Sequence, residues 1–241
     1  MNKRKSPYLN FVVMVVVLFL ITCNLLPTPT TETPHKTLTP ETLQKIDIIE
    51  AYDAINSLSS FQYTTTINSV SSEEPEETSI VYEGVYVSTN YSWRTDLWVS
   101  DQGEKKMTIQ FYSTGNQTWW KLIGLTDWTT EPFPFLNLEE MAKAASPFAL
   151  WPEFLRFFQV GILQSGGMKT ISGLECYEYK FLPVDISDTI ELRMCMTSET
   201  VPLRMEFSAW VGAESTHVIQ ELSHINDPTN VVEPPTDLIR P

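Results

Sequence analysis

The side chains that could carry out chemistry in this sequence are few and dispersed. The three histidines are His35, His217 and His224. They do not form a metal-ligand set, because His35 lies in a Pro/Thr-rich stretch and the other two fall on opposite faces of one predicted strand. The sequence contains no GxSxG, HExxH, P-loop or GxGxxG motif, and the acidic run at 73–77 is typical of a solvated loop. We therefore expect no catalytic residue, no metal, no cofactor and no enzymatic activity.

Cys23 is the side chain whose surroundings indicate a covalent modification. The sequence Leu20-Ile21-Thr22-Cys23 resembles the lipobox of bacterial lipoproteins, in which a small residue precedes the cysteine. Leu20 and Ile21 fit that pattern, whereas Thr22 departs from it, because Gly, Ala or Ser is usual there. We expect an acyl anchor, such as palmitate, on Cys23. An uncleaved signal anchor and free secretion remain open as alternatives.

The segment before Cys23 has the three parts of an export signal. Lys3, Arg4 and Lys5 precede the uncharged run 11–22. That run is shorter than the roughly 20 apolar residues that a spanning helix needs. We expect residues 1–22 to be the export signal, residues 23–39 a Pro/Thr-rich tether, and residues 40–241 a single domain with an N-terminal helix. The domain would then lie outside the cytoplasm, anchored to a membrane of the bacterial cell envelope.

The charge of the chain limits its partners. The formal net charge is −14, and removing the basic export signal makes it more negative. Such a surface repels nucleic-acid phosphates, so we expect no nucleic-acid partner. Aromatic residues make up 12% of the chain, which argues against intrinsic disorder. We expect a folded, soluble domain that is monomeric.

Periodicity predicts an α+β domain. A helix over about 40–58 follows Thr39-Pro40, and period-two alternation begins at Phe61. The predicted strands lie near 61–67, 79–88, 91–99, 105–113, 117–123, 174–182, 189–196 and 202–209. Between them the pattern predicts helices at 138–145 and 151–163. The second of these helices is strongly apolar, so it must be covered or must cover something.

The last three strands can be paired and the pairing checked against charge. If Cys176 lies opposite Cys195, two opposed pairs of unlike charge form, which are Glu178 with Arg193 and Lys180 with Glu191. The same register places apolar pairs on the other face, which are Tyr177 with Met194, Tyr179 with Leu192 and Phe181 with Ile190. Extended to strand 202–209, it pairs Arg193 with Glu206, Met194 with Met205 and Leu192 with Phe207. We expect a three-stranded ladder with this register.

A disulfide between Cys176 and Cys195 follows from this pairing. Directly opposed strand residues fall within the Cα separation that a bridge tolerates, and an exported protein meets oxidising conditions. The count agrees, because the chain has three cysteines and one of them is expected to carry the anchor. The alternative is a pair of ordinary buried thiols.

The adjacent tryptophans Trp119 and Trp120 must point to opposite faces of their strand. One can enter the core, and the other lies on the outer side or under a helix. Two packed aromatic side chains are the simpler interpretation, and a ligand platform is the alternative, so Trp119 is kept as a candidate ligand-binding residue.

In its order of elements and local sequences, the domain resembles the LolA-like superfamily and the LppX/LprG-like lipoproteins, which are bacterial lipoproteins that bind lipids or other lipoproteins. The resemblance covers roughly residues 41–235. It is carried by the local sequences at 58–63, 115–120, 127–128, 173–179, 201–206 and 225–228, together with Pro234.

This resemblance implies a strongly curved antiparallel sheet, an incomplete barrel whose concave side is covered by helices and encloses an apolar cavity. It also implies that the apolar side of the ladder and the helix at 151–163 contact a lipid or other acylated ligand. On this chain the candidate ligand-binding residues are Tyr177, Tyr179, Leu192, Met194, Met205, Phe207, Trp119, Phe154 and Phe158. The implied function is a membrane-tethered lipid-binding protein. The alternative is a cell-envelope interaction or sensor module of the same fold with a filled core.

Overall fold

The computed structural model describes residues 48–70, 78–101, 104–124, 126–131, 138–149, 151, 161–183, 190–211, 214–236 and 238. The chain divides into two compact units. One consists of Met1–Thr42 and Pro132–Met141, of which only 138–141 are described. The other consists of Leu43–Glu131 and Ala142–Pro241, and it contains every strand. Within the described part of the chain, no helix has the length and apolar character needed to cross a membrane.

The second unit is dominated by ten β-strands. In chain order these are β1 Ser60–Val70, β2 Thr78–Val87, β3 Ser92–Asp101, β4 Glu104–Ser113, β5 Thr118–Leu122, β6 Gly161–Ile171, β7 Leu174–Pro183, β8 Ile190–Met196, β9 Pro202–Val211 and β10 Glu214–Ser223. The described helices are α2 Ile48–Asn56 and α3 Leu138–Ala145, with a short 3-10 helix, η1, at Ser88–Asn90. The predicted α+β class is confirmed.

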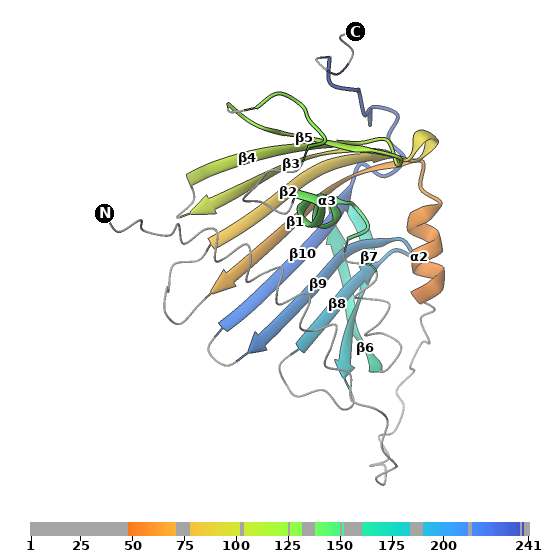
Figure 1. Ribbon diagram of the computed structural model, residues 1–241. Helices are drawn as coiled ribbons and strands as arrows, with labels where there is room; N and C mark the ends of the chain where they lie inside the picture. Colours follow the sequence, from red (N-terminus) through yellow and green to blue (C-terminus); the bar gives the residue numbers. More distant parts are fainter. Residues whose placement is uncertain are drawn as a thin grey trace, which may run out of the picture. The chain divides into compact units, whose positions relative to one another are not determined.

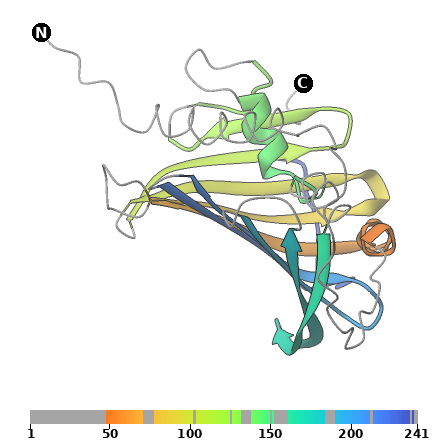
Figure 2. The ribbon, with the colours of Figure 1, turned by 90° about the horizontal axis from the view of Figure 1, so that it is seen from below.

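All ten strands form one antiparallel sheet in the order β5-β4-β3-β2-β1-β10-β9-β8-β7-β6. Two five-stranded meanders, β1–β5 and β6–β10, are therefore joined where the first strand pairs with the last (Figure 1). Figure 2 shows β6 and β7 turned away from the direction of β2 and β3, so the sheet is strongly curved and does not close into a barrel.

The helix predictions have different outcomes. The helix at 138–145 is confirmed with the predicted bounds. The first helix is confirmed over 48–56, and residues 40–47 lie outside the described residues. It ends two residues earlier than predicted, because the Ser57 amide and hydroxyl both bond to the carbonyl of Ala54.

The helix predicted at 151–163 is wrong at its C-terminal end, because Gly161 begins β6. Ile162 and Leu163 pair with Leu182 and Phe181 of β7, so these residues belong to a sheet instead of a helix. Residues 152–160 lie outside the described residues. A short apolar run fits a buried strand as well as a buried helix, which is why periodicity alone misassigned this segment.

Gly166 and Gly167 lie within β6, where they form a β-bulge. Ser165 lies opposite Tyr179 and Gly167 opposite Glu178, so Gly166 is the extra residue. A Cβ atom on Gly166 would lie 2.7 Å from Oε2 of Glu178, and Gly167 has a φ of +94°. The positive φ of Gly167 favours glycine there, whereas the flexible Glu178 side chain can move away from a Cβ atom at position 166.

The predicted register is confirmed for β8 with β9 and wrong by two residues for β7 with β8. Arg193, Met194 and Leu192 do lie opposite Glu206, Met205 and Phe207. On β7, however, Glu178 lies opposite Cys195, Lys180 opposite Arg193, Tyr179 opposite Met194 and Phe181 opposite Leu192. A two-residue shift keeps every side chain on its face, so the face pattern cannot distinguish the two registers.

Candidate ligand-binding face of the sheet

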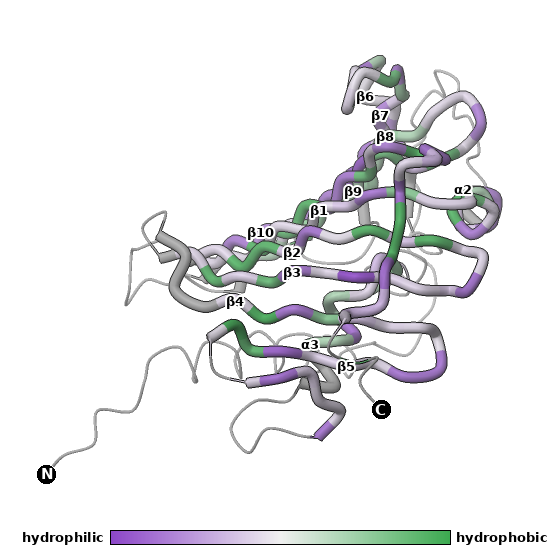
Figure 3. The backbone as a smooth tube through the Cα atoms, turned by 90° about the horizontal axis from the view of Figure 1, so that it is seen from above, coloured by the Kyte–Doolittle hydropathy of each residue, from purple (hydrophilic) through white to green (hydrophobic). Residues whose placement is uncertain are grey.

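The two faces of the sheet differ in burial, as the alternation along β1 shows. Phe61, Tyr63, Thr65 and Ile67 are buried, whereas the residues between them are only half-buried. We call the face that carries these four residues the inner face, and the opposite face the outer face. The hydropathy colouring of Figure 3 shows the same alternation of hydrophobic and hydrophilic positions along the strands.

An uninterrupted line of apolar side chains crosses the inner face over seven neighbouring strands. We call it the apolar row. Its members, from β3 to β7 in sheet order, are Val99, Ile80, Ile67, Val218, Phe207, Leu192 and Phe181. Six of them are buried, and Phe207 is half-buried. The inner face therefore carries a continuous line of apolar, mostly buried side chains across most of the sheet.

A second line, which we call the central row, runs beside the apolar row on the same face. From β5 to β7 it consists of Leu122, Ile109, Leu97, Tyr82, Thr65, Gln220, Met205, Met194 and Tyr179. Three polar side chains stand at its middle, and we call Tyr82, Thr65 and Gln220 the polar spot. All three are buried. Burial raises the pKa of the Tyr82 phenol, so it stays protonated.

The end of α3 contacts the inner face through a buried hydrogen-bond cluster. The hydroxyl of Tyr63 donates to the carbonyl oxygen of Ala145 at 2.6 Å and also contacts the hydroxyl of Thr95. Thr95 donates to the same carbonyl oxygen at 3.2 Å. Burial raises the pKa of Tyr63 despite the opposing bond to Thr95, so the phenol remains a donor. Gly84 leaves room for this arrangement, because a Cβ atom there would lie 2.5 Å from the Tyr63 ring.

Aromatic rings extend this contact towards the Phe61 end of β1. Phe148 packs edge-on against both Phe61 and Tyr86, with ring centroids 6.1 Å and 5.1 Å apart. Trp151 is fully buried and meets Tyr52 of α2 at 5.6 Å. The indole Nε1 of Trp151 has no hydrogen-bond partner among the described residues. Buried polar atoms without partners are rare in native proteins.

The outer face of the C-terminal meander is charged. Glu191 accepts from Arg193 Nε at 2.6 Å and pairs with Lys180 at 3.1 Å. Burial raises the pKa of Glu191, but the hydrogen bonds from these two cations outweigh that effect, so its pKa lies below the ordinary value. Arg204 bridges Glu206 and Glu221 at 3.1 Å each. These ion pairs keep the outer face hydrated and make it a poor surface for an acyl chain.

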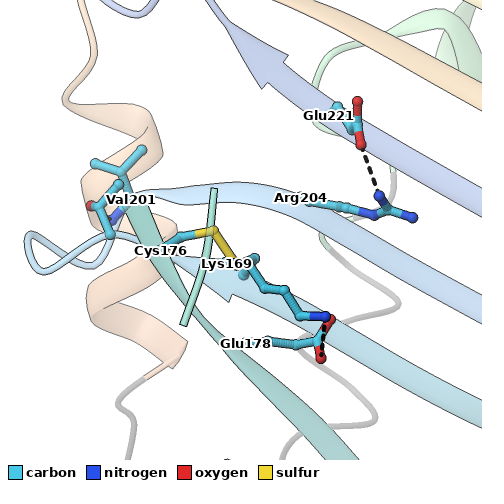
Figure 4. The surroundings of a disulfide bond; sticks show 8 residues. Lys169, Cys176, Glu178, Val201, Arg204 and Glu221 are labelled. Carbon is cyan, nitrogen blue, oxygen red and sulfur yellow. Dashed lines mark hydrogen bonds and ion pairs between the residues drawn. A yellow bond between two sulfur atoms is a disulfide. The ribbon is translucent and has the colours of Figure 1, made fainter. Parts of the chain in front are cut away.

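The predicted disulfide is confirmed, and it lies beside this charged surface. Cys176 and Cys195 are bonded with a Cα–Cα distance of 5.4 Å, although they are diagonal and not directly opposed (Figure 4). Both are buried in a small cluster with Leu203, packed against three partly buried apolar residues, Ile171, Val201 and Ile225. The bridge therefore links β7 to β8 away from the inner face.

The structure brings most of the predicted ligand-binding residues onto the inner face. Leu192, Met194 and Met205 are buried side by side, with Phe207 half-buried next to them. Tyr179 is half-buried opposite Met194. These five residues form one contiguous part of the apolar and central rows.

One predicted residue lies on the other face, and three are not described. Tyr177 shares the inner-face side of β7 with Tyr179, but it is 47% exposed at the end of that strand, opposite the exposed Met168. Trp119 lies on the outer face opposite Tyr112, with ring centroids 5.5 Å apart, while Trp120 is the tryptophan buried on the inner face. Cys23, Phe154 and Phe158 lie outside the described residues.

Sequence reasoning missed the polar spot and the N-terminal half of the inner face. Tyr82 and Leu97 belong to strands that were predicted, but their pairing with the C-terminal meander depends on the contact between β1 and β10. The sequence contained one indication of the polar spot. Gln220 stands between Val218 and Leu222 in an alternating strand, exactly where an apolar residue is expected.

No family model and no curated protein sequence matches this chain. Among solved structures, the chain is similar to the lipoprotein LppX of Mycobacterium tuberculosis, with 14% identity and a TM-score of 0.46, covering 77% of this chain and 96% of LppX. It is also similar to an outer membrane lipoprotein-sorting protein domain from Vibrio parahaemolyticus, with 11% identity and a TM-score of 0.27, covering 73% and 88% of the two chains.

A third similar structure is the MucA/MucB complex of Pseudomonas aeruginosa, with 12% identity and a TM-score of 0.34. This match covers 80% of the present chain and 59% of the other one. Identities this low concern the fold alone.

Proposed function

We propose that this protein is an extracytoplasmic lipoprotein whose inner face binds a lipid or another acylated, apolar ligand. The observation that carries the proposal is the apolar row, which runs unbroken over seven strands of a curved sheet that stays open. An acyl chain is long, narrow and without polar groups, so it matches a surface that extends in one direction and offers only hydrocarbon. Burying it there stabilises the complex by about 25 cal/mol per Å² of apolar surface removed from water.

The side chains next to the apolar row suit ligands of varied shape. Met194 and Met205 lie opposite each other in the central row, and both are buried. Methionine is unbranched and polarisable, so it adapts to irregular apolar surfaces more readily than a β-branched residue does. Tyr179 follows Met194 in the same row and is only half-buried, which places an amphipathic ring at the margin of the candidate face.

The membrane attachment belongs to the same proposal. The export signal at 1–22 would direct the chain out of the cytoplasm, and an acyl group on Cys23 with the tether at 23–39 would then hold the domain close to the membrane that supplies or receives the ligand. A single acyl chain gives only marginal membrane binding, so stable anchoring needs a second chain or another membrane contact. Metabolic labelling with a clickable fatty acid, compared between the native chain and Cys23→Ala, tests the anchor. Equal labelling of both would show that Cys23 is not the acylated residue.

Native mass spectrometry of the full chain released from detergent micelles tests the ligand. The expected result is a bound acyl ligand that co-purifies, or uptake of added oleate with one-to-one stoichiometry. If no apolar ligand binds under either condition, the lipid-binding proposal fails. The protein would then be an interaction module with a filled core.

A further inference from the structure

The polar spot interrupts the apolar character of the inner face at its centre. Tyr82, Thr65 and Gln220 are neighbours on β2, β1 and β10, the three strands where the two meanders join. Leu97 and Met205 flank them within the central row. The spot therefore lies between apolar side chains within the central row, far from either edge strand.

Gln220 is the member of the polar spot whose hydrogen bonding is incomplete. Its Nε2 donates to the hydroxyl of Thr65 at 3.0 Å. Its Oε1 has no hydrogen-bond partner among the described residues, although the side chain is only 1% exposed. The amide nitrogen of Gln220 is therefore hydrogen-bonded within the protein, whereas its amide oxygen is an acceptor without a partner among the described residues.

A free acceptor at this position is costly. A buried polar group without a partner destabilises a fold, whereas an apolar side chain of the same shape is nearly neutral there. Val218 and Leu222, the neighbours of Gln220 on the same face of β10, are apolar and buried. A glutamine between them therefore points to a role that a methionine or leucine could not fill.

We propose that Gln220 Oε1 accepts a hydrogen bond from a hydroxyl or amide N–H group carried within the apolar part of the ligand. The inference rests on the proposed function and narrows its ligand class to acyl ligands that are not pure hydrocarbon along the chain. Leu97 and Met205 lie beside the polar spot in the central row, and the apolar row runs along one side of it, so a ligand that follows the apolar row would bring a mid-chain polar group, and not a terminal head group, next to Oε1. The preference arises because a plain chain would cover Oε1 without pairing it.

Oleate and ricinoleate form a matched pair of probes, because ricinoleate is oleate with one added mid-chain hydroxyl. Both are added in equal amounts to the full chain in detergent, and native mass spectrometry reads the ratio of the two complexes in one spectrum. Competition within one sample cancels the effect of the detergent. The native chain is expected to prefer ricinoleate by about tenfold, the size of a buried hydrogen bond whose loss leaves an acceptor unpaired.

Two variants make the test specific. Gln220→Met keeps the length of the side chain and removes the acceptor, so the ratio is expected to fall to about one. Gln62→Met makes the same substitution on the outer face of β1 and is expected to keep the preference of the native chain. The comparison of the two probes in the native chain needs no variant, so it remains decisive even if Gln220→Met fails to fold.

The outcomes separate the two proposals. Binding of both probes without preference overturns the inference, because Oε1 is then satisfied by a trapped water or by nothing, and leaves the lipid-binding proposal standing. A preference that persists in Gln220→Met also overturns it. If neither probe binds the native chain, the lipid-binding proposal itself fails and the inference fails with it.

Discussion

Adjacent residues of one strand lie on opposite faces of the sheet, so a buried apolar side chain alternates with a polar or charged one. On β9, Met205 is buried in the central row, while its neighbours Arg204 and Glu206 form ion pairs on the outer face. On β1, Ile67 lies in the apolar row and Thr66 on the outer face. One-sided burial is common in antiparallel sheets, where one face packs and the other meets water. The inner face of this sheet carries an apolar row over seven strands with a buried polar spot beside it.

Apolar burial and charge are therefore divided between the two faces. The outer face carries charge that keeps an acidic domain in solution, and its ion pairs contribute little to stability. The inner face contributes most of the hydrophobic stabilisation and offers the only long apolar path among the described strands. Substitutions on neighbouring residues of one strand should therefore have very different effects.

The largest difference is expected at Phe61 and Gln62. Phe61 is fully buried against Tyr63, Tyr86 and Phe148, so Phe61→Ala should lower the free energy of unfolding by about 3–5 kcal/mol. Gln62→Ala, on the outer face, should cost less than about 1 kcal/mol, the net value of its bond to Asn230. Urea denaturation followed by tryptophan fluorescence measures both. Similar losses in the two variants would contradict the division between faces.

The disulfide should have the next largest effect. It closes a loop between residues 19 apart in sequence. The double variant Cys176→Ala/Cys195→Ala should lose about 3 kcal/mol of unfolding free energy, because the unfolded chain regains loop entropy. Reduced native protein should show the same loss, which controls for the altered side chains. Because the bridge lies away from the inner face, oleate binding by the folded variant should be unchanged, and a loss of binding would place the bridge in the site.

The smallest effect is expected at the Glu191 ion pairs. The pKa of Glu191 in the folded protein lies below its ordinary value of 4.5, so its charged form stabilises the fold at pH values above 4.5. This contribution is lost as the pH falls through the lowered pKa. Glu191→Gln should therefore be less stable than the native chain by about 0.5 kcal/mol near neutral pH, a difference that vanishes in acid. If the stability difference between Glu191→Gln and the native chain grew as the pH fell, the prediction would be contradicted.

Sequence periodicity predicted the strands well because alternation is a local property. The strands from 79 to 123 and the ladder of β8 with β9 follow directly from it. The register of β7 with β8 could not be predicted, because two registers that differ by two residues place the same side chains on the same faces. The disulfide was still correct, because a diagonal pair in an antiparallel ladder also comes within bonding distance.

The candidate site was predicted only in its C-terminal half. Leu192, Met194, Met205 and Phe207 could be assigned to one face because their strands follow one another in sequence. The polar spot depends on the pairing of β1 with β10, two strands more than 140 residues apart, which no local pattern specifies. Gln220 was visible in the sequence as a polar residue at a position where alternation predicts an apolar one. The polar spot itself could not be predicted, because Thr65 and Tyr82 lie beside Gln220 only in the folded sheet.

The most direct test of the central claim compares Ile67→Trp with Thr66→Trp. The first substitution adds bulk to the middle of the apolar row, and the second adds the same bulk to the outer face of the same strand. Both variants are checked for folding by circular dichroism, because overpacking can cost about 1–3 kcal/mol. Oleate binding is then measured by native mass spectrometry of the full chain. Folded Ile67→Trp is expected to lose at least about tenfold in affinity, about 1.4 kcal/mol, while Thr66→Trp is expected to bind as the native chain does. Equal binding by both variants would contradict the claim that the inner face holds the ligand.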